Sequence, residues 1–292
     1  MAEAKLTVGN VEIVALDDGA VDFPFPLTQI FPGTTQEAWA SYRGRYPEVF
    51  AGPDTWRAHW GGYLLRSEGR NILVNTGVGS ALSNPGVVNN LNGGVDGRLL
   101  HELQAVGVRP EDVDIVFFTH LHPDHVGYNL SQRGPNSKAM FSRARYVVHQ
   151  ADWEAFDSRE VQELFPFSFW EETLGPLANL GVLDFLSGES ALTNEITAIP
   201  TPGHTPGHMS LLVNSAGERA VILGDVAIHP AQVTEADWHF AFELDQAQAN
   251  RTRREFLDRL ATEGTTVAAC HFPAPGIGKI VRIEGRRYWQ GL

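Results

Sequence analysis

The feature that most constrains this chain is a dense group of metal-binding side chain types placed directly after an apolar segment. Residues 114–119 read Asp-Ile-Val-Phe-Phe-Thr, which is typical of a buried strand. The six positions that follow contain four candidate ligands: His120, His122, Asp124 and His125. In an extended segment residues two apart share a face, so His120 and His122 can point together before Pro123 turns the chain. Four such groups at a strand end can address two neighbouring ions.

Further downstream, histidine or aspartate again stands where a predicted strand meets a loop. The Pro- and Gly-punctuated loop 201–208 contains His204 and His208, and Asp225 and His271 each end an apolar run. Functional side chains commonly lie at such junctions, because the strand holds them still and the loop exposes them. We therefore treat these positions as members of the same site.

Strands and helices alternate along the chain in two comparable halves, which predicts an α/β layered fold. A first strand is expected to end at Asp17-Asp18-Gly19. The predicted strands cover 11–16, 62–66, 71–74, 114–119, 144–148, 196–199, 209–213, 220–223 and 266–270, with a final hairpin at 279–289, and the predicted helices cover 99–106, 152–156 and 247–260.

Neither a composition break nor a repeat divides the 292 residues, of which 43% are hydrophobic, so we predict one domain over 1–292. It carries two aromatic-rich insertions, at about 20–60 and 158–180. Two roles remain open for their aromatic side chains: a roof over an apolar substrate pocket, or a subunit contact in a homodimer. The candidate pocket residues are Phe25, Trp60, Phe167 and, beyond the insertions, His229.

Charge and composition narrow the classes of substrate and partner that we expect for this protein. The formal net charge is -13 and there is no basic run, so nucleic acid is not expected as a substrate and a small molecule is. No apolar stretch approaches the roughly 20 residues that a membrane span needs, and the N-terminus lacks the apolar core of a secretion signal, so we expect a cytoplasmic protein without membrane contact. The single cysteine, Cys270, excludes an intrachain disulfide. Strand alternation predicts that it faces the core, away from His271.

Taken together, these motifs resemble those of the metallo-β-lactamase-fold hydrolases, over nearly the whole chain. The family's His-x-His-x-Asp-His motif is matched at 120–125, and its later ligands are matched by His204, Asp225 and His271. The segment from Gly224 to His229 and the C-terminal third most resemble the lactonase and methyl-parathion-hydrolase-like branch. The resemblance implies a four-layer αββα fold, with two mixed β-sheets between helices.

The resemblance also implies a ligand set for two divalent ions. One ion would take His120, His122 and His204, the other would take Asp124, His125 and His271, and Asp225 would bridge both. Zinc is the expected metal, although manganese, cobalt and iron suit the same ligands. Two ions sharing a water lower its pKa from 15.7 to about 7 and so supply a bridging hydroxide as nucleophile. Asp124 and Asp225 are the candidate catalytic residues, and Asp124 is the candidate proton carrier to the leaving group.

One position departs from the family pattern. Residues 73–77 read Leu-Val-Asn-Thr-Gly, where the family usually has Asp before Thr-Gly. That Asp supports the metal ligands by accepting their hydrogen bonds, so Asn75 predicts weaker support and a lower metal affinity. His208 is the other residue predicted to lie behind the ligands.

The resemblance and the aromatic insertions together predict hydrolysis of a neutral, apolar ester or lactone, such as an acyl-homoserine lactone, with phosphotriesterase side activity. Histidine at 122, where iron-dependent redox members of the family have glutamate, favours hydrolysis. Two alternatives stay open: a mononuclear iron oxygenase acting on sulfur or glutathione-linked substrates, and a non-catalytic binding protein on the same fold.

Overall fold

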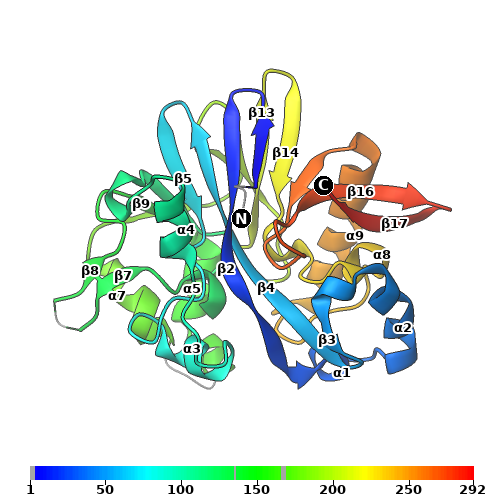
Figure 1. The fold of residues 1–292 in the computed structure, drawn as a ribbon. Coiled ribbons are helices and arrows are strands. Elements are labelled where there is room, and N and C mark those ends of the chain that lie inside the picture. Colours follow the sequence, from blue (N-terminus) through cyan, green and yellow to red (C-terminus); the bar gives the residue numbers. More distant parts are fainter. Residues whose placement is uncertain (1–3, 135, 166–168) are drawn as a thin grey trace.

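The computed structural model describes residues 4–134, 136–165 and 169–292. Two β-sheets lie face to face, with helices on their outer sides (Figure 1). Strands of the first sheet follow the order β1-β2-β4-β5-β6-β9-β10, with β3 beside β4. They are β1 (Lys5–Val8), β2 (Val11–Pro26), β3 (Phe50–Gly52), β4 (Thr55–Ser67), β5 (Arg70–Val74), β6 (Ile115–Phe117), β9 (Arg145–His149) and β10 (Leu183–Leu186).

The second sheet follows the chain order from β11 to β17. Its strands are β11 (Ser190–Ala191), β12 (Ile196–Pro200), β13 (Met209–Ser215), β14 (Glu218–Ile222), β15 (Thr266–Ala268), β16 (Ile277–Ile283) and β17 (Arg286–Gly291). Most neighbours in it are antiparallel, but β14 and β15 are parallel because helix α9 connects them. A separate short ladder joins β7 (Leu130–Gln132) to β8 (Lys138–Ala139).

Helices cover both outer faces. They are α1 (Leu27–Ile30), α2 (Gln36–Arg45), α3 (Pro85–Asn90), α4 (Leu99–Ala105), α5 (Gln150–Asp157), α6 (Arg159–Gln162), α7 (Gly175–Ala178), α8 (Ala231–Thr234) and α9 (Gln246–Glu263), with short turns η1 (Pro47–Val49), η2 (Pro110–Asp112), η3 (Pro123–His125), η4 (Trp170–Leu174) and η5 (Gly224–Val226). In Figure 1, α4 and α5 lie outside the first sheet and α9 lies outside the second.

Three clusters of buried apolar side chains fill the spaces between these layers. One lies between the sheets and joins Ile13 and Leu65 to Leu211. A second packs the outer face of the first sheet against α4, α5 and α7, and a third packs the second sheet against α9. Such a layering of helix, sheet, sheet and helix is the predicted αββα architecture. No helix among the described residues combines the length and apolar character needed to cross a membrane.

Strand β2 corrects the prediction for the N-terminal region. A strand ending at Asp17-Asp18-Gly19 was expected, followed by the aromatic-rich insertion at about 20–60, but β2 continues to Pro26 and pairs with β4 along most of its length. The register shifts between Asp17 and Gly19, where Gly19 has φ +119. A bulge of this kind breaks the alternation of apolar residues and so imitates a turn in the sequence. The resulting β2–β4 ribbon crosses the centre of Figure 1.

Candidate metal centre

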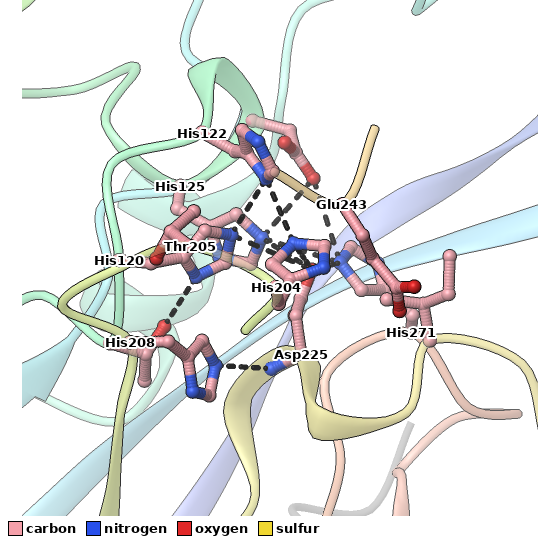
Figure 2. Close-up of polar contacts among 12 residues, drawn as sticks. His120, His122, His125, His204, Thr205, His208, Asp225, Glu243 and His271 are labelled. Atoms are coloured by element: carbon pink, nitrogen blue, oxygen red, sulfur yellow. Dashed lines mark hydrogen bonds and ion pairs between the residues drawn. The ribbon is translucent and has the colours of Figure 1, made fainter. Parts of the chain in front are cut away.

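The motif at 120–125 lies where the prediction placed it, directly after strand β6. His120 follows the last buried residues of that segment, and Pro123 opens the 3₁₀ turn η3, which brings His125 back toward the sheet. His204 and Asp225 come from the second sheet, after β12 and β14. The candidate centre is therefore formed where the two sheets meet. Figure 2 shows five histidine rings that converge there, those of His120, His122, His125, His204 and His271.

One part of the centre, which we call the three-histidine half, consists of His120, His122 and His204. His122 Nδ1 lies 2.8 Å from His204 Nε2 and 3.1 Å from His120 Nε2. All three side chains are buried, with at most 4% exposure. Three imidazoles facing one point in this way are a common first shell for a divalent transition metal.

The other part, the two-histidine half, consists of His125, His271 and Asp124. The Nε2 atoms of the two histidines are 3.3 Å apart. Asp124 Oδ2 lies 3.3 Å from His125 Nε2 and 3.6 Å from His271 Nε2, at the side of the pair that faces the cavity described below. His271 Nδ1 donates to the carbonyl of His59 at 2.9 Å, which fixes the ring.

Asp225 lies between the two halves. Its Oδ2 atom is 3.2–3.6 Å from four histidine Nε2 atoms, those of His120, His125, His204 and His271. Its backbone N–H donates to His208 Nε2 at 2.8 Å, and His208 Nδ1 lies 3.0 Å from the carbonyl of Thr201. His208 thus stands behind Asp225 rather than in the centre, in the position expected for a supporting residue.

The donor set suits divalent cations. Two overlapping sets of candidate ligand atoms lie close together, and Asp225 belongs to both. The other members of the first set are His120, His122 and His204, and those of the second are His125, Cys270 and His271, while Asp124 belongs to neither. His122 Nε2 and His204 Nδ1 are buried and have no hydrogen-bond partner among the described residues. The opposite nitrogens of these rings crowd together at the centre, where a cation would use their lone pairs and relieve the crowding.

The pKa shifts differ between the halves, because burial acts to lower the pKa of His125 and of His271 but neighbouring groups that include Asp225 outweigh it and raise both. Burial lowers the pKa of His120 and of His122 well below the usual value and also lowers that of His204, so these rings are neutral and can bind metal. Burial acts to raise the pKa of Asp225, but His271 and His125 outweigh it and hold the pKa well below its usual value. The centre therefore holds a buried carboxylate anion ready for a cation.

A buried carboxylate that the sequence did not reveal holds the two main ligand loops together. Asp152, from helix α5, accepts hydrogen bonds from the Leu121 N–H at 3.1 Å, the Thr205 hydroxyl at 3.0 Å and the Gly207 N–H at 2.6 Å. Leu121 lies between His120 and His122, and Thr205 follows His204. One side chain thereby fixes the relative position of all three residues of the three-histidine half.

A second buried anchor holds the segment next to Asp225. The fully buried Arg253 of α9 donates to the carbonyl of Val226 at 2.7 Å, next to Asp225, and to the carbonyl of Ala236 at 3.1 Å. It also forms an ion pair with buried Glu243. Arg253 lies on the helix predicted at 247–260, and its burial follows from tertiary contacts that the sequence does not show.

Asn75 lies behind the two-histidine half, in the supporting position that the motif predicted. Its Nδ2 atom lies 2.8 Å from His125 Nδ1, and its Oδ1 atom accepts from the Thr119 N–H at 3.0 Å. Its backbone φ of +62 lies in the left-handed region, which Asn tolerates better than most residues do. Both sides of the amide are therefore engaged.

Cys270 packs in the core between the sheets, as predicted, but it does not face away from the site. Its Sγ donates to Asp225 Oδ1 at 3.3 Å, and the thiol lies within reach of the two-histidine half. The alternation rule fails here because β15 ends at Ala268, so residues 269–271 form a turn instead of extended strand. Gly61 permits this close approach, since a Cβ there would come within 2.9 Å of the Cys270 carbonyl.

A cavity of about 350 Å³ lies against both halves of the centre. His122, Asp124, Asp225 and His271 contribute to its wall, and the rest of the described wall is mostly aromatic and aliphatic. Phe25 and Trp60, both predicted for the pocket, are part of it. The aromatic-rich insertions also contribute Phe23, Trp56 and Phe165, whereas the sequence did not single out the other apolar wall residues, which are Leu91, Leu164, Ile228, Phe240 and Phe242.

Of the two remaining predicted pocket residues, only His229 is described, and it does not line the cavity. His229 is fully buried in an aromatic cluster, with ring centroids 4.9 Å from Trp39 and 5.4 Å from Phe50, and is not among the residues lining the cavity. Its Nδ1 accepts the Ala231 N–H at 3.1 Å, which turns the ring toward the start of α8. Phe167 lies outside the described residues.

Comparison with known proteins agrees with this geometry. Residues 62–271 match the family model of the metallo-beta-lactamase superfamily. The chain is 30% identical over 188 residues to an N-acyl homoserine lactonase of Bacillus sp, which covers 61% of this chain and 68% of that protein. It is also 28% identical over 188 residues, with the same coverage, to the N-acyl homoserine lactonase AiiA of Bacillus thuringiensis subsp. kurstaki. The chain belongs to the metallo-beta-lactamase superfamily.

Within that superfamily it is a metal-dependent hydrolase of the lactonase branch. Solved structures show the same fold over almost the whole chain. The dizinc quorum-quenching lactonase AidC, in complex with a product, superposes with a TM-score of 0.82 at 21% identity, covering 99% of this chain and 97% of that chain. The hydrolase AbOPH gives a TM-score of 0.81 at 23% identity with the same coverage.

Proposed function

We propose that this protein uses two divalent ions, zinc in the first instance, to hydrolyse neutral apolar lactones and esters, with acyl-homoserine lactones as the preferred class. The observation that carries the proposal is the cavity: candidate ligands form one side of it, and the described remainder is apolar apart from Asn90. Its volume of about 350 Å³ falls within the range of small-molecule sites. The lactonase relatives support the reaction class.

Charge in the cavity favours a neutral substrate. Neither lysine nor arginine occurs among the described residues that line it. An anionic substrate would therefore meet aromatic walls and the acidic side chains of Asp124 and Asp225 without a cation from the protein. This argues against glutathione-linked substrates, which carry carboxylates, and so against the oxygenase alternative. A lactone with an acyl chain can place its ring at the ligands and its chain against the walls.

The reaction depends on groups that the chain supplies around the ions. When bound, the two ions would supply an activated water and polarise the substrate carbonyl. His120, His122 and His204 would hold one ion, while His125, His271 and Asp124 would hold the other, with Asp225 between them. Asp225, buried and anionic, would keep the two positions at a fixed separation. The aromatic walls would exclude bulk water from the reacting groups.

Asp124 is the residue we assign to proton transfer. Burial acts to raise the pKa of Asp124, but His125 and His271 outweigh it and lower the pKa to about 2, so the carboxylate is ionised before reaction. Asp124 lines the cavity, so its carboxylate can accept the proton that the attacking water loses and return it to the leaving oxygen as the ring opens. Phosphotriesters, which are neutral and need no cationic group, are proposed as a slower side reaction.

The test is a substrate panel on protein with measured metal content. We expect hydrolysis of acyl-homoserine lactones, with kcat/KM rising for longer acyl chains. Each buried CH₂ should lower the activation free energy by up to about 0.8 kcal/mol. Aryl esters and phosphotriesters should be slower. Chelator-treated protein is the control, and restoring zinc should restore the rate. Absence of metal-dependent hydrolysis across the panel would contradict the proposal and favour a binding protein on this fold.

A further inference from the structure

The remote nitrogens of the five candidate histidine ligands have different surroundings, and the difference points to an inequality between the two ion positions. A histidine that binds metal through one nitrogen carries a proton on the other, and that N–H is normally held by an acceptor. His271 Nδ1 meets the carbonyl of His59 at 2.9 Å, and His120 Nδ1 meets the Thr119 hydroxyl, which can accept, at 3.0 Å. His122 Nε2 and His204 Nδ1 have no partner among the described residues.

His125 alone among the five faces a donor within the described structure. The backbone N–H of Thr119 can only donate, so at 3.0 Å it fixes the carbonyl oxygen of Asn75 toward itself. The amide nitrogen of Asn75 then lies 2.8 Å from His125 Nδ1. That nitrogen can only donate as well, so the hydrogen bond requires a bare lone pair on Nδ1.

The other side of the ring agrees with this assignment. With Nδ1 accepting, the imidazole proton lies on Nε2, which has carboxylate oxygens of Asp124 at 3.3 Å and Asp225 at 3.5 Å as acceptors. Nε2 is the atom of His125 that faces the other two members of the two-histidine half. To bind an ion there, His125 must move its proton to Nδ1, where it would point at the donor group of Asn75.

We infer that Asn75 makes the two ion positions unequal: the three-histidine half binds its ion first and tightly, and the two-histidine half binds its ion more weakly. This rests on the two-ion centre of the proposed function. An aspartate at position 75 would accept from both the Thr119 N–H and the His125 Nδ1–H, and would remove the conflict. Asn75 is a positioning residue, since it acts only through His125.

The experiment is a titration of chelator-treated protein with Zn²⁺, followed by calorimetry and by long-range ¹H–¹⁵N NMR of ¹⁵N-histidine-labelled protein. We expect two steps for the wild type, with the second at least about 10-fold weaker. His125, assigned by comparison with His125→Gln, should carry its proton on Nε2 both without metal and after one equivalent. Asn75→Asp should strengthen the second step by about 10- to 100-fold and change the first by less than about threefold.

Asn129→Asp is the matched control. Asn129 is also fully buried and accepts from the Thr76 hydroxyl at 2.8 Å, so the variant adds the same charge nearby without facing the His125 ring. Its two steps should remain as far apart as in the wild type. Two equal steps in the wild type, or a proton on His125 Nδ1 after one equivalent, would overturn the inference even if Asn75→Asp failed to fold. Protein that binds no zinc contradicts the proposed function instead, and two unequal steps without lactone hydrolysis would contradict only that function.

Discussion

The two halves of the candidate metal centre contain similar candidate ligands but differ in the residues that support them. The three-histidine half is held by Asp152, which ties its two loops together through donors at 2.6–3.1 Å. The two-histidine half depends on a turn, on Cys270 and on an asparagine whose donor faces His125. Ligand identity alone would make the halves equivalent. The residues that contact the ligands from behind are what make zinc binding strong in one half and weaker in the other.

Removing one histidine from each half gives the largest test of this contrast. His204→Ala should weaken the tight zinc step by at least about 100-fold and lower kcat/KM by at least about 1,000-fold, because the ion that is bound first is lost. His271→Ala should remove only the weak step. Calorimetry and metal analysis would distinguish the two variants. Loss of the tight step in His271→Ala would reverse the assignment of the halves.

A substitution at Asp124 tests proton transfer separately from metal binding. Asp124→Asn should lower kcat by about 100- to 10,000-fold at saturating zinc, because the amide cannot relay a proton to the leaving oxygen. The tight zinc step should be unchanged, since Asp124 lies on the two-histidine side. Steady-state kinetics on protein of known metal content measures both. Full turnover with both ions bound would remove Asp124 from the mechanism.

Cys270 offers a finer test of the two-histidine half. Cys270→Ala leaves Asp225 Oδ1 without the donor that lies at 3.3 Å, and should weaken the second zinc step by about 10-fold. Cys270→Ser keeps a donor at the same place and serves as the matched control, with an expected change under about threefold. If both variants behaved alike, the thiol would not act through this hydrogen bond.

His229 gives the baseline for a buried histidine outside both halves. Burial lowers its pKa from 6.5 to about 3, so its contribution to stability is complete above pH 6.5 and is lost as the pH falls toward 3. The difference in unfolding free energy between the wild type and His229→Leu should therefore decrease on acidification, by at most about 1.4 kcal/mol per pH unit below 6.5. Denaturant titrations at a series of pH values, with and without chelator, should give the same dependence of this free-energy difference on pH. A slope that depends on metal would place His229 in contact with the centre.

The centre was predictable where each ligand follows an apolar run in regular structure. His120, His204 and Asp225 each come after a strand that the hydrophobic pattern identifies, so their order and spacing carried most of the information. The hairpin at 279–289 was predicted for the same reason and is confirmed as β16 and β17. That these residues bind metal stays a prediction. The prediction that residues 1–292 form one domain also stays a prediction.

The sequence could not show features that depend on long-range contacts. The bulge at Gly19 hid half of β2, and the early end of β15 turned Cys270 toward Asp225. Asp152 reads in the sequence as an ordinary acidic residue in the first turn of a helix, although it is fully buried. Phe240 and Phe242 lie in a segment without periodicity, so no local pattern marked them as cavity residues.

The hydrogen bonds of Asp152 also bear on when the protein acquires its ions. They join the loops of His120 and His204 through protein groups alone, so the loss of chain entropy at these loops belongs to folding and not to ion uptake. In a freshly folded molecule the three-histidine half would already be formed. The molecule could exchange its metal during its lifetime without unfolding, so its metal content would follow the ions present around it.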